Sequence, residues 1–84
     1  MKELTFEEFC QQPMKLVMHI SGEKEHYLHK HSEPVGVSII TVTPVKKNGN
    51  FGTPRQIFIF DQKDYATVDQ VYVAYMAKIC GVSA

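Results

Sequence analysis

Residues 35–45 (VGVSIITVTPV) constrain the fold more than any other stretch, because they are the most strand-like run in the chain. In an extended strand, Val37 and Ile39 point to one side of the sheet. Ile40 and Val42 point to the other side, so both faces of the run are apolar in its middle. This pattern is typical of a central strand that is covered on both sides, or of a strand whose second face is a contact surface.

A second run with the same property lies at residues 55–61 (RQIFIFD). Isoleucines occupy one of its faces and phenylalanines the other. The residues are Ile57 and Ile59 on one side, and Phe58 and Phe60 on the other. The loop between the two runs carries the turn signal Asn48-Gly49.

A hairpin is predicted before these two strands. Residues 14–21 alternate between apolar and polar side chains, and residues 25–31 form a returning strand. Gly22 suits the first central position of a two-residue type II′ turn. That turn would place His19 directly opposite His26.

Two helices are predicted at the ends of the chain. Residues 4–13 begin with a capping box, T-x-x-E at residues 5–8, and end at a proline. A longer helix begins with T-x-x-Q at residues 67–70, a second capping box, and ends at Gly81, where a left-handed glycine cap belongs.

One domain spanning residues 1–84 is the expected organisation, because the chain has 84 residues and shows no linker or repeat. The element order is α-β-β-β-β-α. We therefore predict an α+β fold in which an antiparallel sheet of three to four strands carries a long C-terminal helix on one face and a short N-terminal helix.

Three of the four histidines lie close together in HYLHKH, at His26, His29 and His31. If this segment is a loop, the three imidazoles can converge on zinc. If it is a strand, His29 and His31 share one face while His26 shares the other with His19. The spacing matches no specific ligand motif. We therefore expect no cofactor and keep a histidine zinc site as an alternative.

The cysteines and the missing motifs bear on catalysis and location. Cys10 and Cys80 form no C-x-x-C pair, so we expect two reduced, half-buried thiols, with Cys10 on the inner side of the first helix. No nucleophile elbow, zinc-protease or phosphate-loop motif occurs, and we expect no enzymatic activity. With no signal peptide and no apolar run of transmembrane length, we expect a cytoplasmic protein.

Nucleic-acid binding is the main alternative function. The order of elements is similar to that of double-stranded-RNA-binding domains, but residues 67–70 (TVDQ) stand where that family carries a lysine cluster, which excludes the assignment. Lysine plus arginine equals aspartate plus glutamate, at nine each, so the chain has no basic surplus for phosphates. One basic spot remains, at Lys46, Lys47 and Arg55, in a loop with Phe51 at its tip.

The apolar surplus of the two strands favours a protein-interaction module instead. A single helix covers only one face of a sheet, so one Val/Ile/Phe face would be left as a contact surface for another protein or for a second copy. Small neutral domains of this kind often serve phages or mobile elements as accessory proteins that inhibit or regulate a host enzyme. The candidate protein-binding residues are Val37, Ile39, Ile40, Val42, Ile57, Phe58 and Phe60.

Overall fold

The computed structural model describes residues 3–81, which form one five-stranded antiparallel sheet and two helices. Each strand pairs with the next one along the chain, so the sheet is a simple meander. The predicted α+β fold is therefore confirmed. In chain order the elements are α1 (Phe6–Cys10), β1 (Lys15–Ser21), β2 (Glu25–Ser32), β3 (Val37–Pro44), β4 (Arg55–Phe60), β5 (Lys63–Tyr65) and α2 (Val68–Cys80).

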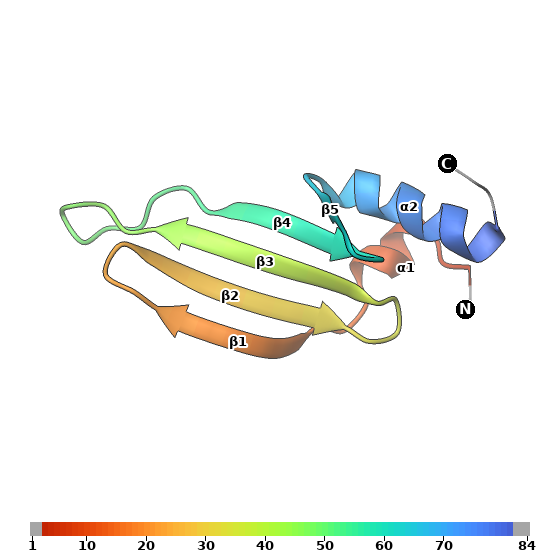
Figure 1. The fold of residues 1–84 in the computed structure, drawn as a ribbon, viewed down its shortest axis with the longest axis horizontal. Coiled ribbons are helices and arrows are strands. Elements are labelled where there is room, and N and C mark those ends of the chain that lie inside the picture. The colour runs from red at the N-terminus through yellow and green to blue at the C-terminus, as the bar shows by residue number, and fades with distance from the viewer. Residues whose placement is uncertain (1–2, 82–84) are drawn as a thin grey trace.

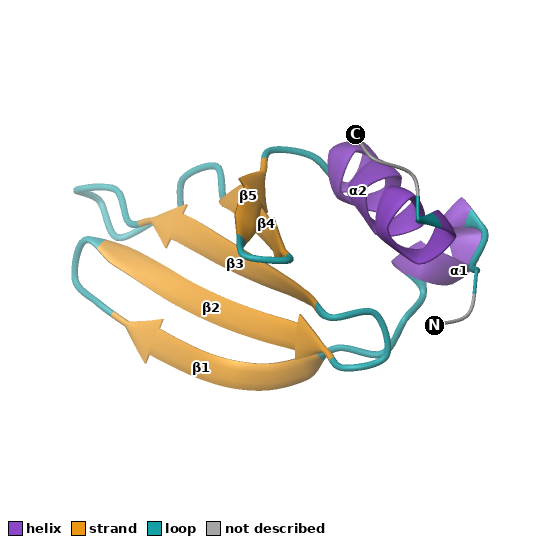
Figure 2. Cartoon of the chain, turned by 45° about the vertical axis from the view of Figure 1, so that its right-hand side comes forward, coloured by secondary structure: helices purple, strands orange, loops and turns teal. Residues whose placement is uncertain are grey.

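The molecule is elongated, because both helices lie at one end of the sheet (Figure 1). Its principal extents are 49 × 22 × 22 Å, and its radius of gyration is 14.8 Å. A compact domain of this length would have a radius of gyration of about 12 Å. Figure 2 shows the same arrangement from a second angle, with β1, β2 and most of β3 running away from the helices. About half of the sheet thus has no helix beside it.

The hydrophobic core fills the space between the helices and the nearby end of the sheet. Val71 and Tyr75 of α2 are 0% and 1% exposed, and they form the centre of this core. The Phe9 ring of α1 lies 5.0 Å from the Tyr75 ring, which ties the short helix to the long one. The buried members of the core are Phe9, Val35, Val37, Phe58, Phe60, Val71 and Tyr75.

The helix ends follow the local signals in the sequence. The Thr5 backbone N–H donates to Glu8 Oε1 at 3.0 Å, and the Glu8 N–H donates to Thr5 Oγ1 at 3.2 Å, which confirms the first capping box. Gly81 adopts φ = 70° at the end of α2, as predicted. The second capping box is wrong in one detail. The Gln70 side chain accepts from Ala66 N–H at 3.0 Å rather than from the cap residue itself.

The first hairpin has a different register from the predicted one. Gly22 N–H donates to Glu25 O at 3.0 Å, so the turn residues are Glu23 and Lys24, and His19 lies opposite Leu28. Gly22 does not adopt a positive φ, so the predicted type II′ turn is wrong. Glycine is needed there for another reason. A Cβ at this position would lie 2.7 Å from Glu25 O, closer than van der Waals contact allows.

A fifth strand, β5, was not predicted. It follows a two-residue turn in which Asp61 and Gln62 both have positive φ, 52° and 66°. Lys78 Nζ of α2 lies 2.9 Å from Asp61 Oδ1, and this pairing lowers the Asp61 pKa. The predicted sheet of three to four strands is therefore one strand short. The C-terminal helix has 13 residues, so it is also shorter than the long helix that we predicted.

The buried Tyr75 hydroxyl should make the fold sensitive to alkali. Burial raises the Tyr75 pKa, and neighbouring Tyr72 adds to the rise. The folded state therefore keeps its proton at a pH where the unfolded chain loses it. This contribution to stability is complete below about pH 10 and is lost as the pH rises above that value. Urea unfolding at increasing pH should show a decline of up to about 1.4 kcal/mol per pH unit from this group.

The Tyr75→Phe variant separates this effect from the titration of lysines and other tyrosines. Its free energy of unfolding should fall less steeply above about pH 10 than that of the wild type. Only the slopes need to be compared, whatever the stability of the variant at neutral pH. If the free energy of unfolding falls equally steeply with pH in the wild type and in Tyr75→Phe, the loss of stability at alkaline pH does not come from Tyr75.

Candidate functional site

The two faces of the sheet differ in what covers them. We call the side that carries Phe58 and Phe60 the helix-covered face, because these residues belong to the core with α1 and α2. We call the opposite side, which carries Ile40 and Ile57, the helix-free face. Within residues 3–81, α2 contacts β4 and β5, α1 contacts α2, and neither helix lies on the helix-free face. This face is therefore open in the described part of the chain.

The seven residues that the sequence proposed for protein binding divide between these faces. Strand alternation places four of them on the helix-covered face and three on the helix-free face. Val37, Phe58 and Phe60 are buried in the core and Ile39 packs against it, whereas Ile40, Val42 and Ile57 lie on the open side.

The centre of the helix-free face is a continuous apolar surface across four strands. The register places Met18 beside His29, His29 beside Ile40, and Ile40 beside Ile57. The next row runs Ile20, Tyr27, Val42 and Arg55. Val42 is only 7% exposed although no helix lies over it, because its neighbours on both sides carry large side chains.

Most side chains in the row of the helix-free face that lies toward the helices are polar or charged. Toward the helix end of the sheet, the register places Lys15 beside His31, and His31 beside Ser38. The His31 Nδ1 and Ser38 Oγ atoms lie 2.9 Å apart. The row continues through Ile59 on β4 to Asp64 on β5, so Lys15 and Asp64, of opposite charge, lie on the two edge strands. An apolar centre with a polar rim is the usual anatomy of a protein–protein interface.

The part of the helix-covered face that lies beyond the helices is mixed in character, because Leu28 and Phe51 lie there among polar side chains. Its residues include His26, Thr41, Thr43 and Gln56. Gln56 Nε2 donates to Thr41 Oγ1 at 3.5 Å, at the limit of a hydrogen bond. This surface is suited to water. The helix-free face differs in that apolar side chains occupy neighbouring positions on four strands with no helix over them.

Strand β1 forms an exposed edge of the sheet next to the helix-free face. All seven of its residues are exposed, and Met18 at 47% and Ile20 at 52% lie on the helix-free face. Its register with β2 shifts between Leu16 and Met18, which marks a bulge at Val17. Beyond the bulge, β1 offers unpaired backbone groups beside apolar side chains, a combination suited to pairing with another chain.

The histidines do not form one cluster. His29 and His31 lie on the helix-free face, whereas His26 lies on the other face with its ring 6.5 Å from the His19 ring. No group of three or more metal-ligating side chains occurs within residues 3–81. The Nε2 atom of His29 is buried and has no hydrogen-bond partner among the described residues. The segment is a strand, and its alternation separates the three predicted ligands.

The basic loop does not assemble its four predicted residues on one surface. Phe51 is not at the tip, because it pairs with Val45 and its ring lies 4.9 Å from the His26 ring, on the helix-covered face. Arg55 pairs with Val42 and belongs to the helix-free face. Lys46 and Lys47 are exposed at the turn. The aromatic ring and the guanidinium are thus directed to opposite sides of the sheet.

The cysteines differ from their prediction. Cys10 and Cys80 are both free and both exposed, rather than half-buried. Helix α1 has only five residues and buries Phe9, so Cys10 remains exposed to solvent although its side chain faces the inner side of the helix, toward the core.

Sequence reasoning left three residues of the helix-free face out of the proposed site, namely Met18, Ile20 and Tyr27. Their alternation with polar residues placed all three on one side of the hairpin, and the register of β1 and β2 confirms this. What the sequence did not show is that this side is continuous with Ile40 and Ile57. The sheet pairing of β2 with β3 makes that connection.

No helix among the described residues has the length and apolar character needed to cross a membrane. Comparison with protein-family models, with curated proteins and with solved structures found no match to the chain. Any assignment of function therefore rests on the geometry of the two faces.

Proposed function

We propose that the protein is a non-catalytic protein-binding module that binds another protein through the helix-free face of its sheet. The observation that carries this proposal is the concentration of apolar side chains on the face that no helix covers. Met18 and Ile20 are 47% and 52% exposed, in a surface continuous with Ile40 and Ile57. Large exposed apolar patches of this kind are rare on monomeric soluble proteins, and they mark interaction sites.

The edge strand β1 supports the same proposal. A partner strand that pairs with β1 would extend the sheet and bring its own side chains beside Met18 and Ile20. Main-chain hydrogen bonds would supply affinity, and the apolar side chains would supply specificity. The charges of Lys15 and Asp64 at the rim would fix the orientation of the partner.

The setting that we propose is an accessory role in the cytoplasm. Small size, zero net charge and the absence of catalytic motifs suit a protein of the kind that phages and mobile elements use to inhibit or regulate a host enzyme or complex. A second copy of the chain is the other partner that the helix-free face would accept.

The test compares two neighbouring residues that point to opposite faces. Ile40→Lys places a charge in the apolar centre, and Thr41→Lys places the same charge on the polar side of the same strand. Loss of a desolvated residue at the centre of an interface costs about 2 kcal/mol or more, so Ile40→Lys should reduce partner binding at least tenfold. Thr41→Lys should leave binding unchanged. Binding is measured by capture of a stoichiometric partner from the native host, followed by titration of that partner.

A third variant protects the test against a folding defect. Ile20→Lys alters an exposed residue of the same face, and its thermal melt should match that of the wild type while partner binding falls. Sedimentation of the pure protein identifies a second copy as the partner if a dimer dissociates in Ile20→Lys. The proposal is abandoned if the captured partner binds Ile40→Lys and Thr41→Lys equally well, or if the wild type is monomeric and captures nothing.

A further inference from the structure

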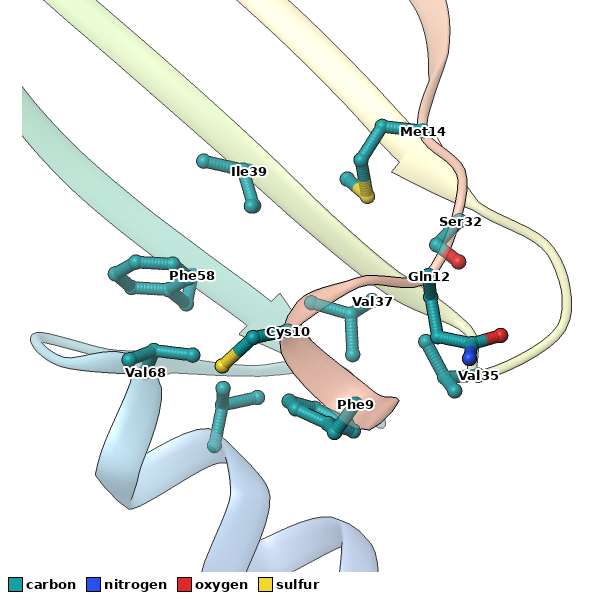
Figure 3. A pocket seen from close by; sticks show the side chains of 11 residues that line it. Phe9, Cys10, Gln12, Met14, Ser32, Val35, Val37, Ile39, Phe58 and Val68 are labelled. Carbon is teal, nitrogen blue, oxygen red and sulfur yellow. The ribbon is translucent and has the colours of Figure 1, made fainter. Parts of the chain in front are cut away.

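A small pocket lies between α1 and the helix-covered face, on the other side of the sheet from the proposed interface. Its volume is about 110 Å³. Figure 3 shows Ser32 and Met14 at one end of this pocket, and Phe58 and Val68 at the other. The lining residues are Phe9, Cys10, Gln12, Met14, Ser32, Val35, Val37, Ile39, Phe58, Val68 and Val71.

One polar group in this pocket has no partner. Ser32 is 1% exposed, and its Oγ atom makes no hydrogen bond within the described residues. The backbone of Ser32 is satisfied separately, since its carbonyl oxygen accepts from Gly36 N–H at 2.7 Å. A buried hydroxyl without a partner is unfavourable, and native structures rarely keep one without a reason. The Ser32 hydroxyl is therefore available to a molecule that enters the pocket.

The walls of the pocket set the chemistry of that molecule. No aspartate, glutamate, lysine or arginine lines it, so a charged ligand would be desolvated without compensation. Apolar side chains such as Val37, Phe58 and Val71 form most of the surface. A dry apolar cavity of about 150 Å³ accepts a benzene ring, so this smaller pocket of about 110 Å³ suits a molecule no larger than a single small ring.

Water fits the pocket less well than such a molecule. An ordered buried water makes about three hydrogen bonds. The only other polar side chains of the lining are Cys10 and Gln12. Thiols are weak hydrogen-bond groups, and one of the two N–H groups of the Gln12 amide already donates to Glu8 O at 2.9 Å, so few partners are left for a water.

We propose that this pocket binds a small neutral amphipathic molecule, a single ring or short aliphatic chain that carries one hydroxyl group, with Ser32 as its polar anchor. The apolar part contacts the walls, and the ligand hydroxyl exchanges a hydrogen bond with Ser32 Oγ. Cys10, at the end of α1, lines the pocket and is exposed to solvent, so the ligand would enter beside it.

The probes that test this proposal are phenol and benzene, which differ by one hydroxyl group. Titration of the isotope-labelled full chain is followed by the NMR shifts of the amides of Val35, Val37 and Val71. Phenol should shift these amides and bind the wild type more tightly than Ser32→Ala, by about two- to tenfold, because one hydrogen bond is lost. Benzene should bind the wild type and Ser32→Ala equally, since it has no group to pair with the serine.

A second variant tests the location independently of the serine. Val68→Phe places a larger side chain in the pocket from a half-buried position at the start of α2, so the fold can accommodate the substitution. The variant should abolish the NMR shifts caused by phenol and by benzene. Equal phenol affinity in the wild type and Ser32→Ala would overturn the proposal, as would binding that survives in Val68→Phe. The absence of any shift at the solubility limit of phenol would do the same. None of these outcomes depends on the helix-free face, so failure here leaves the proposed protein-binding function standing.

Discussion

Replacing Val71 by aspartate is expected to prevent the domain from folding at neutral pH. Val71 is 0% exposed and lies at the centre of the core, among buried apolar side chains. A buried carboxylate without a partner costs several kcal/mol even after relaxation. The total stability of a small domain is only about 5–15 kcal/mol. Circular dichroism should therefore show loss of the cooperative thermal transition.

Val73→Asp provides a matched control on the same helix. Val73 lies two residues further along α2 and is 68% exposed, so its carboxylate stays in water. A surface substitution of this kind should change the free energy of unfolding by no more than about 0.5 kcal/mol. Equal damage from the two substitutions would contradict the placement of α2, because it would mean that both faces of the helix are buried.

Replacing Phe60 by alanine should lower the free energy of unfolding by about 3–5 kcal/mol. The Phe60 ring is 4% exposed, and its centroid lies 6.0 Å from that of Tyr75. Lys78 Nζ lies 5.5 Å from the same ring, so a cation–π contact is lost with it. The prediction is checked by urea denaturation, in which the midpoint should fall while the slope of the transition stays constant.

Phe51→Ala is the control for this substitution, because the same side chain is removed from a surface position. Phe51 is 60% exposed and makes a ring contact only with His26 in the described part of the chain. Its removal should cost less than about 1 kcal/mol. If Phe51→Ala destabilises the protein as much as Phe60→Ala, the uncovered end of the sheet is more tightly packed than the structure shows.

The two proposals occupy opposite sides of the sheet, and this separation comes from strand alternation. Ser32 and Val37 point toward the helices, whereas Ile40 and Ile57 point away from them. A ligand in the pocket and a protein on the helix-free face would therefore bind at the same time without contact. Substitutions at Ser32 should accordingly leave partner capture unchanged.

The face to which most strand residues belong could be predicted from the sequence, but the bulge at Val17, which moves Leu16 to the helix-covered face, and the hairpin register could not. Alternation depends only on the two-residue period of an extended backbone, so it placed Met18 and Ile20 correctly on one side with Tyr27. The register depends on which residues form the turn. Gly22 was assigned to the turn itself, whereas the structure uses it where the backbone of Glu25 approaches too closely for a side chain.

The fifth strand illustrates a limit of a different kind. The turn at Asp61 and Gln62 needs positive φ at both residues, a conformation that a sequence without glycine does not suggest. The ion pair between Lys78 and Asp61 joins this turn to a residue of α2 that lies 17 positions later in the chain. A contact between residues so far apart cannot be read from the local pattern around either of them.

The sequence by itself determined the features that depend on neighbouring residues. These are the caps at Thr5, Thr67 and Gly81, the alternation of the strands, and the two apolar faces of β3 and β4. Only the tertiary structure decided which apolar face of the sheet the helices cover, and what part of that face they cover. Helix α2, with 13 residues, is about 20 Å long and lies at one end of a molecule that extends over 49 Å. It therefore buries Phe58 and Phe60 and leaves Ile40 and Ile57 open to a partner.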